Sequence, residues 1–224
     1  MVAVVVQARF DSSRLPGKAL LPLADRPILI RVLEALSHIP CDRYILACPE
    51  DCVTMFEPLA QETAFDLSPG SKEDVLNRYC DAIRRFKIDR VIRATADNPF
   101  VFADAAQEIN REATAVSADY AGYQRLPYGA GVESVAAEAL LKAEREALHA
   151  AEREHVCPYL YNHPELFSLH RPLAPHVWQE PEFRLTIDTP EDYERAQKLY
   201  TFLPSNSFRY NGSTINAAYR RLFV

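Results

Sequence analysis

Apolar runs alternate with amphipathic segments over about the first hundred residues of the chain. The continuous run at 2–7 is typical of a strand buried on both faces of a parallel sheet. Apolar residues at helical spacing predict helices that begin near Pro27, at Val53 and at Ser71, whereas shorter runs predict strands at 43–48, 64–67 and 90–95. This alternation predicts a doubly wound α/β sheet, whose ligands lie beyond the carboxyl ends of its strands.

The second half of the chain is less regular. Helices are expected at 137–149 and 151–163, a late strand at 184–187 and a short helix within the terminal segment 205–224. Thr189, followed by Pro190 and two acidic residues, marks the start of a further helix. We interpret residues 1–224 as a single domain in which about 120–180 forms a small insertion.

The composition narrows the class of protein. With 48% hydrophobic and 25% charged residues, the chain fits a globular protein. No apolar run is long enough to cross a bilayer, and the N-terminal segment lacks the features of a signal peptide, so we expect a cytoplasmic protein without a membrane partner. Five cysteines without metal-ligand spacing fit reduced thiols. The net charge of −6 argues against a nucleic-acid partner, so an anionic substrate requires a local basic cluster.

Such a cluster follows the first strand. Arg9, Arg14 and Lys18 lie in one loop, and arginine forks, a lysine charge and main-chain N–H groups together suit a triphosphate. Gly17 allows a close approach of the backbone, although the loop lacks the spacing of a Walker A motif. A solvated basic loop is the alternative, but the position directly after a buried strand favours phosphate binding.

Two aspartates also lie at the ends of predicted strands. Asp97 follows the strand at 90–95, and Asp188 follows the strand at 184–187. Mg²⁺ prefers one or two carboxylates together with phosphate oxygens and water, so the pair predicts a magnesium site facing the triphosphate. Either acid alone is equally well explained as a cap of the turn or helix after it, so the argument depends on the pairing.

Five segments, in chain order, resemble the motifs of one protein family. Residues 7–18 resemble its Q-A-R-x-x-S-x-R-L-P-G-K loop, and residues 73–79 resemble its D-V-L-x-R-Y segment. Residues 93–99 resemble R-x-T-x-D-x-P, residues 152–159 resemble E-R-E-H-V-T-P-Y, and residues 184–192 resemble R-L-T-x-D-T-P-E-D. The family is the spore-coat-polysaccharide type of cytidylyltransferase, a branch of the CMP-KDO and CMP-acylneuraminate synthetase superfamily. The resemblance covers the chain to about Leu203.

This resemblance implies a fold and an activity. The fold is a Rossmann-like nucleotidyltransferase fold with a mixed, mostly parallel sheet, and it forms a homodimer through the 120–180 insertion, which also binds the acceptor. The activity is Mg²⁺-dependent transfer of CMP from CTP, or of a nucleotide from another NTP, to a sugar or sugar-acid acceptor. Pyrophosphate is released, and the product serves surface or spore-coat polysaccharide biosynthesis.

The resemblance also implies roles for individual residues. Arg14, Lys18, Asp97 and Asp188 are the expected catalytic residues, and the two aspartates are the expected metal ligands. The expected nucleotide-binding residues are Gln7, Ala8, Arg9, Ser12, Arg14, Lys18, Ser71, Asp74 and Arg78. The expected acceptor-binding residues are Glu133, Arg153, Glu154 and His155. A sheet-edge acid is the alternative for Glu133, and a helix-face histidine is the alternative for His155.

Two departures from the family pattern bear on these roles. Asp11 adds a negative charge beside the supposed triphosphate, and Asn98 stands where a cysteine is frequent. Two other functions suit such a chain. A nucleotide-sugar glycosyltransferase is disfavoured by the three cations of the loop, and a non-catalytic nucleotide-binding protein is disfavoured by the presence of Asp97 and Asp188.

Overall fold

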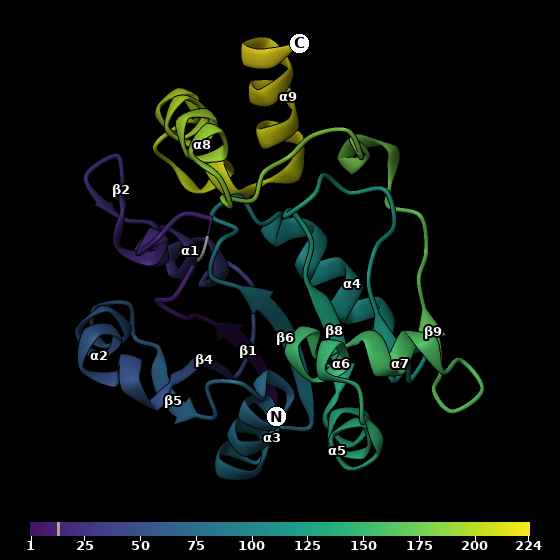
Figure 1. The fold of residues 1–224 in the computed structure, drawn as a ribbon. Helices are drawn as coiled ribbons and strands as arrows, with labels where there is room; N and C mark the ends of the chain where they lie inside the picture. Colours follow the sequence, from purple (N-terminus) through teal and green to yellow (C-terminus); the bar gives the residue numbers. More distant parts are fainter. Residues whose placement is uncertain (13) are drawn as a thin grey trace.

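A seven-stranded sheet runs through the centre of the computed structural model, which describes residues 1–12 and 14–224 (Figure 1). In spatial order its strands are β5 (Asp66–Gly70), β4 (Arg43–Pro49), β1 (Val2–Gln7), β6 (Arg90–Thr95), β8 (Glu133–Ala136), β7 (Tyr120–Ala121) and β9 (Leu169–His170). The strands from β5 to β6 are parallel, β8 is antiparallel to both its neighbours, and β9 is parallel to β7. The predicted α/β class with a mixed, mostly parallel sheet is confirmed.

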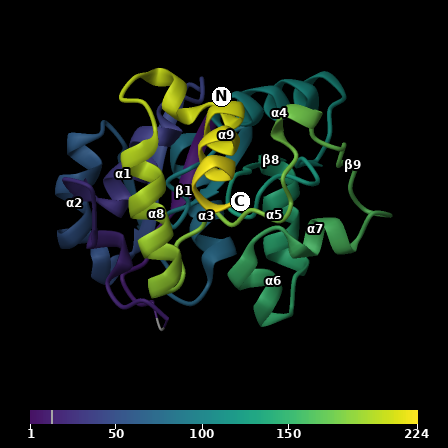
Figure 2. The ribbon, with the colours of Figure 1, turned by 90° about the horizontal axis from the view of Figure 1, so that it is seen from above.

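Helices cover both faces of the sheet because alternate residues of β1 point to opposite sides. Val4 and Val6 pack with one group of helices, whereas Ala3 and Val5 pack with another. The first group consists of α1 (Ile28–Leu36), α2 (Val53–Glu62), α4 (Ala103–Ala115), α8 (Pro190–Phe202) and α9 (Gly212–Phe223). The second consists of α3 (Val75–Phe86), α5 (Ala137–Glu146), α6 (Ala150–His155) and α7 (Pro158–Asn162). Figure 2 shows α8 and α9 in contact on the first face.

Several short elements complete the chain. They are the antiparallel pair β2 (Pro22–Leu23) and β3 (Arg26–Pro27) and the 3₁₀ turns η1 (Lys18–Leu20), η2 (Glu50–Cys52), η3 (His176–Trp178) and η4 (Ser207–Tyr210). Among the residues that the structure describes, no helix is both long enough and apolar enough to span a bilayer.

The helix predicted to begin at Ser71 begins instead at Val75. Asp74 is its N-cap, because its carboxylate accepts the backbone N–H of Asn77 at 2.9 Å. The Ser71 hydroxyl accepts the backbone N–H of Asp74 at 3.0 Å. The polar residues 71–74 therefore form a hydrogen-bonded turn that precedes the helix and is not part of it.

Two further strand predictions need correction. The strand predicted at 64–67 lies at Asp66–Gly70, because Ala64 takes a positive φ of 58° in the turn after α2. The strand predicted at 184–187 is wrong: this segment forms only an isolated bridge between Arg184 and Tyr128. Its backbone bonds to a loop instead, with the Leu185 N–H donating to the Tyr128 carbonyl at 2.8 Å.

The segment at about 120–180 does not stand apart from the sheet, because it supplies β7, β8 and β9 to one edge. The helix predicted at 137–149 ends at Glu146, and the helix predicted at 151–163 is divided into α6 and α7. The division lies at Val156, whose φ of 74° cannot continue a helix. Neither α4 nor β8 was expected from the sequence pattern.

The predicted start of α8 is confirmed, and it forms a reciprocal cap. The Thr189 hydroxyl accepts the backbone N–H of Asp192, whose carboxylate accepts the backbone N–H of Thr189. We expect Thr189→Ala to lower the free energy of unfolding by about 1 kcal/mol in urea denaturation, because one N–H of the first turn loses its partner. Thr201→Ala, on the exposed end of the same helix, should change it by less than about 0.5 kcal/mol. Equal losses in the two variants would contradict this account of the cap.

Candidate active site

A cleft of about 890 Å³ opens beyond the carboxyl ends of β1 and β6. The two strands are neighbours, with Gln7 opposite Thr95, so the loops that follow them meet at one edge of the sheet. Of the residues named from the sequence, those that line the cleft are Gln7, Ala8, Arg9, Ser12, Arg14, Lys18, Arg78, Asp97, Glu133, Glu154, His155 and Asp188. The basic loop and both aspartates therefore share one cavity. Ser13 of this loop lies outside the described residues.

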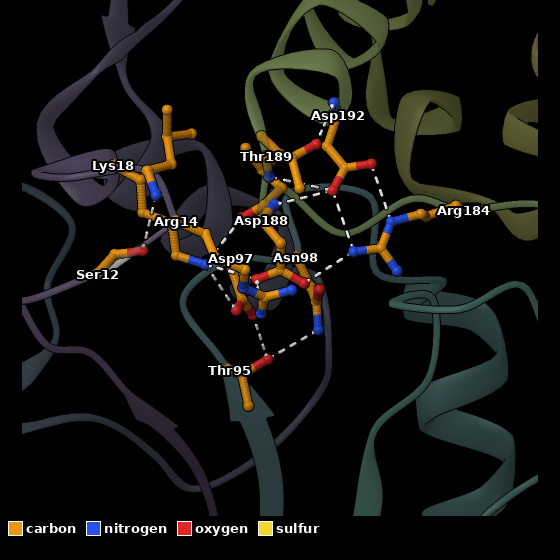
Figure 3. Close-up of polar contacts among 12 residues, drawn as sticks. Ser12, Arg14, Lys18, Thr95, Asp97, Asn98, Arg184, Asp188, Thr189 and Asp192 are labelled. Atoms are coloured by element: carbon orange, nitrogen blue, oxygen red, sulfur yellow. Dashed lines mark hydrogen bonds and ion pairs between the residues drawn. The ribbon is translucent and has the colours of Figure 1, made fainter.

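The ammonium group of Lys18 lies between the two aspartates at the centre of this cleft (Figure 3). Its Nζ donates to Asp97 Oδ2 and to Asp188 Oδ1, both at 3.0 Å, and to the Ile187 carbonyl at 2.8 Å. The Asp188 side chain is only 9% exposed and that of Lys18 15%, so these charges interact with little screening by solvent. The meeting of the cationic loop and two distant acids, on which the sequence argument depended, is present in the structure.

The backbone of the basic loop turns Lys18 towards the acids. Gly17 has a φ of +66° and precedes η1, whose first turn is closed by the Leu20 N–H donating to the Gly17 carbonyl at 2.9 Å. Upstream, the Ser12 hydroxyl accepts the Leu15 N–H at 3.3 Å. These turns hold Lys18 so that its side chain is largely buried, although several residues of the loop are exposed.

The remaining charges of the loop lie nearer to solvent. Arg14 is 63% exposed, and its Nη2 lies 3.2 Å from Asp188 Oδ1. Arg9 pairs with Glu154 across the cleft at 3.7 Å. Both arginines therefore face the cavity with guanidinium N–H groups that a ligand can reach.

Asp11 is turned away from the centre of the cleft. Its carboxylate pairs with Lys72 at 2.5 Å, and Lys72 also donates to Asp51 at 2.9 Å. Hydrogen bonds to Asp11 and then to Asp51 raise the pKa of Lys72, and the bond from Lys72 lowers the pKa of Asp51. The negative charge that departs from the family pattern is thus paired with a lysine at the surface and does not line the cleft.

Comparisons with known proteins agree on the family of this chain. The cytidylyltransferase family model matches residues 3–215. The chain belongs to the cytidylyltransferase family. It is 34% identical over 206 residues to the spore coat polysaccharide biosynthesis protein SpsF of Bacillus subtilis, with 89% of this chain and 86% of that protein covered. The chain is therefore a nucleotidyltransferase, as the resemblance of its five segments implied.

Solved structures agree with this cytidylyltransferase fold. A cytidylyltransferase from Leptospira borgpetersenii superimposes with a TM-score of 0.90 at 26% identity, covering 98% of this chain and 94% of that one. CMP:2-keto-3-deoxy-manno-octonic acid synthetase, solved in complex with CTP, superimposes with a TM-score of 0.69 at 16% identity, covering 89% and 98%. The second likeness establishes the shared fold alone.

Arg78 of this cytidylyltransferase lines the cleft although it is only 2% exposed. Its Nη1 donates to the Ser71 carbonyl at 3.0 Å, while Nε has no hydrogen-bond partner among the described residues. Burial lowers the pKa of Arg78. A buried guanidinium with one N–H left without a partner lowers stability, so the burial of Arg78 is not fully compensated by hydrogen bonds within the described residues.

The structure does not bring Ser71, Asp74 or Arg153 to the lining of the cleft. Ser71 and Asp74 hold the turn and N-cap before α3, as described above. Arg153 donates to Asp74 at 2.7 Å and to the carbonyls of Glu144 and Ala147 at 2.9 and 3.0 Å. Its guanidinium therefore ties the start of α3 to the carboxyl end of α5, where a cation is favourable.

Glu133 lines the cleft, but both its carboxylate oxygens have protein partners. Arg93 Nη1 donates to Oε2, and the Tyr120 hydroxyl donates to Oε1 at 2.8 Å. Burial lowers the pKa of Arg93, but the charge and hydrogen bond of Glu133, together with the nearby Cys157 and Tyr79, outweigh it and the net pKa is raised. Burial and Glu133 both raise the pKa of Tyr120, so this hydroxyl keeps its proton. Neither Arg93 nor Tyr120 was named from the sequence as a site residue.

The strand register of β6 against β8 would have identified Arg93 as a partner of Glu133. Arg93 on β6 lies directly opposite Glu133 on β8, and opposite charges at such a position form a cross-strand pair. Because β8 was not predicted, the pair could not be read from the sequence.

The Arg93–Glu133 pair yields a stability prediction. Glu133→Gln leaves a buried guanidinium without its carboxylate, so we expect the free energy of unfolding to fall by about 3 kcal/mol. Adding Arg93→Met should recover most of this loss, because no buried charge then remains unpaired. Urea denaturation measures both changes, with Glu138→Gln on the exposed face of α5 as the matched control. A Glu133→Gln protein as stable as the control would refute the role given to this pair.

Proposed function

We propose that this cytidylyltransferase transfers CMP from CTP to an oxygen of a sugar or sugar-acid acceptor, releases pyrophosphate and serves surface polysaccharide biosynthesis. The observation that carries the proposal is the position of Lys18 between Asp97 and Asp188, with Arg9 and Arg14 facing the same cavity. The relationship to SpsF, a protein named for spore coat polysaccharide biosynthesis, supports the pathway. The likeness to a synthetase solved with CTP is consistent with the nucleotide.

The nucleotide binds along the basic loop in this proposal. Arg9, Arg14 and Lys18 neutralise the triphosphate, and the backbone of Gln7 and Ala8 with the Ser12 hydroxyl provides further hydrogen-bonding groups. Arg78 also lines the cleft, and its guanidinium lies near the nucleoside part.

Asp97 and Asp188 fit a divalent cation. Asp97 Oδ2 and Asp188 Oδ1 both lie 3.0 Å from one ammonium nitrogen, so the two oxygens converge on a shared point. The described residues contain no cluster of three or more His, Cys, Asp or Glu side chains able to hold a metal. Two carboxylates completed by phosphate oxygens and water are what Mg²⁺ prefers. When bound there, Mg²⁺ would neutralise negative charge on the phosphates.

The chemical step is an in-line displacement at the α-phosphorus of CTP. A bond forms between the acceptor oxygen and phosphorus, the bond from phosphorus to the bridging oxygen breaks, and pyrophosphate leaves with that electron pair. Lys18 and Arg14 stabilise the charge that develops on the transferring and leaving groups. The protein contributes by positioning and electrostatics, and no covalent intermediate on the enzyme is required.

The acceptor binds on the side of the cleft formed by the segment 120–180. Glu154 and His155 lie there at the carboxyl end of α6, and His155 is exposed and able to receive the acceptor proton. Because both oxygens of Glu133 are engaged, Glu133 acts through Arg93 and Tyr120, which reach the acceptor in its place. A homodimer through this segment and a cytoplasmic location remain predictions of the sequence.

A substrate matrix tests the proposed reaction. Each of the four NTPs is combined with Mg²⁺ and a panel of acidic and neutral sugars, and pyrophosphate release is measured. We expect release that depends on both CTP and an acceptor. If none of the four NTPs gives pyrophosphate release above background and the protein instead turns over a nucleotide sugar, it is a glycosyltransferase.

Variants of two cleft residues test the site. Asp97→Asn and Arg14→Ala should each lower the rate of pyrophosphate release by about 100-fold or more, because each removes one charge that faces the transition state. Asp81→Asn and Arg111→Ala are the matched controls, since both side chains are open to solvent and, among the residues that the structure describes, form ion pairs only with a residue one turn away in their own helix. Wild-type rates in folded Asp97→Asn or Arg14→Ala protein would remove the site assignment.

A further inference from the structure

Each of the two cleft aspartates is held by a protein group on one carboxylate oxygen and directs the other oxygen at the Lys18 ammonium. Asp97 accepts the Thr95 hydroxyl on Oδ1 at 2.6 Å and the Lys18 ammonium on Oδ2 at 3.0 Å. Asp188 accepts the Arg184 guanidinium on Oδ2 at 2.9 Å and Lys18 on Oδ1 at 3.0 Å. In each carboxylate one oxygen is therefore anchored, while the other faces the Lys18 ammonium (Figure 3).

The direction of the Thr95 hydrogen bond is fixed by Asn98. The Asn98 amide nitrogen donates to Thr95 Oγ1 at 2.8 Å. An amide nitrogen can only donate, and the hydroxyl has a single proton, so that proton is directed at Asp97. Thr95 is the last residue of β6, which gives this chain of bonds a rigid base in the sheet.

The anchor of Asp188 is fixed by a second carboxylate. Asp192 accepts Arg184 Nε on Oδ1 at 2.9 Å and Arg184 Nη2 on Oδ2 at 3.0 Å, and the same Nη2 reaches Asp188. Asp192 also accepts the backbone N–H of Asp188 at 3.1 Å. Arg195 Nη1 also donates to Asp192 Oδ1, at 2.8 Å, so two guanidinium groups hold this carboxylate. The Asp192 carboxylate therefore keeps the Arg184 guanidinium in place.

These anchors matter because an aspartate carboxylate rotates easily. The last torsion of its side chain has a broad, twofold energy profile, so without an anchor the plane of the carboxylate can turn away from the point that its oxygen must face. Arg14, 3.2 Å from Asp188 Oδ1, also competes for the presented oxygen. Replacing a group that hydrogen-bonds to a metal ligand commonly weakens metal binding by about 10- to 100-fold.

We propose that Thr95 and Arg184 are positioning residues that fix the rotation of the Asp97 and Asp188 carboxylates, so that each carboxylate aims one oxygen at a divalent cation. Asn98 and Asp192 fix the orientation of these two residues. The inference rests on the metal-dependent transfer proposed above, and it assigns to both residues a role that acts through the aspartates rather than through contact with the substrate.

Binding of Mn²⁺ alone to the full chain, without nucleotide, tests the Thr95 arm. Free Mn²⁺ is followed by electron paramagnetic resonance during titration. Thr95→Val keeps the shape of the side chain and removes the hydroxyl, so we expect Mn²⁺ to bind about 10-fold more weakly. Thr95→Ser restores the hydroxyl and should bind within about twofold of the wild type. Thr201→Val, far from the cleft on α8, is the control and should bind as the wild type does.

Arg184→Met tests the second arm by the same titration. It should weaken Mn²⁺ binding by about 10-fold or more, because Asp188 loses the bond that holds its Oδ2. Thermal unfolding is recorded for every variant, since Arg184 also supports Asp192. If Arg184→Met fails to fold, the Thr95→Val and Thr95→Ser pair decides the proposal.

Asp97→Asn serves as the reference that separates this inference from the proposed function. If Asp97→Asn abolishes Mn²⁺ binding while folded Thr95→Val binds like the wild type, the positioning role is overturned and the metal site stands. If Asp97→Asn binds Mn²⁺ like the wild type, the metal site and the positioning role both fall. If Thr95→Val and Thr95→Ser weaken binding equally, the hydroxyl is not the determinant and the proposal is likewise refuted.

Discussion

The ammonium of Lys18 holds together three segments that lie far apart in the sequence. Asp97 and Asp188 are brought near each other, where two negative charges repel, and Lys18 offsets that repulsion with one positive charge 3.0 Å from each. The contact with the Ile187 carbonyl uses the third donor of the ammonium group. The loop after β1, the turn after β6 and the segment before α8 are thereby fixed relative to one another.

The backbone makes this meeting possible. The Ile187 N–H donates to the Asp97 carbonyl at 2.9 Å, so the two acid-bearing segments are bonded to each other before any side chain is considered. Gly129 lets a third segment approach them. It has a φ of +91°, and a Cβ there would lie 2.7 Å from the Thr186 backbone nitrogen and 2.8 Å from Asn98 Oδ1. A glycine is therefore required where the 128–131 loop crosses the cleft.

Sequence reasoning succeeded where the determining interactions are local. Apolar periodicity placed β1, α2 and β6, and the Thr189-Pro190 cap placed the start of α8, because these patterns depend only on neighbouring residues. It failed at β8, whose four residues gain their strand conformation from pairing with β6 and β7. It also could not foresee that Arg153 would turn to the helix ends, since that depends on how α3, α5 and α6 pack together.

The two halves of the sheet divide the chemistry of the cleft. Its parallel strands β1 and β6 lead into the basic loop and Asp97, the groups proposed to bind the triphosphate. The antiparallel edge carries Glu133 and Tyr120, which face the proposed acceptor. The Arg93–Glu133 bond joins these two halves across β6 and β8. Acceptor binding, as proposed above, therefore falls to the less regular edge, which is also the region where the sequence pattern is least informative.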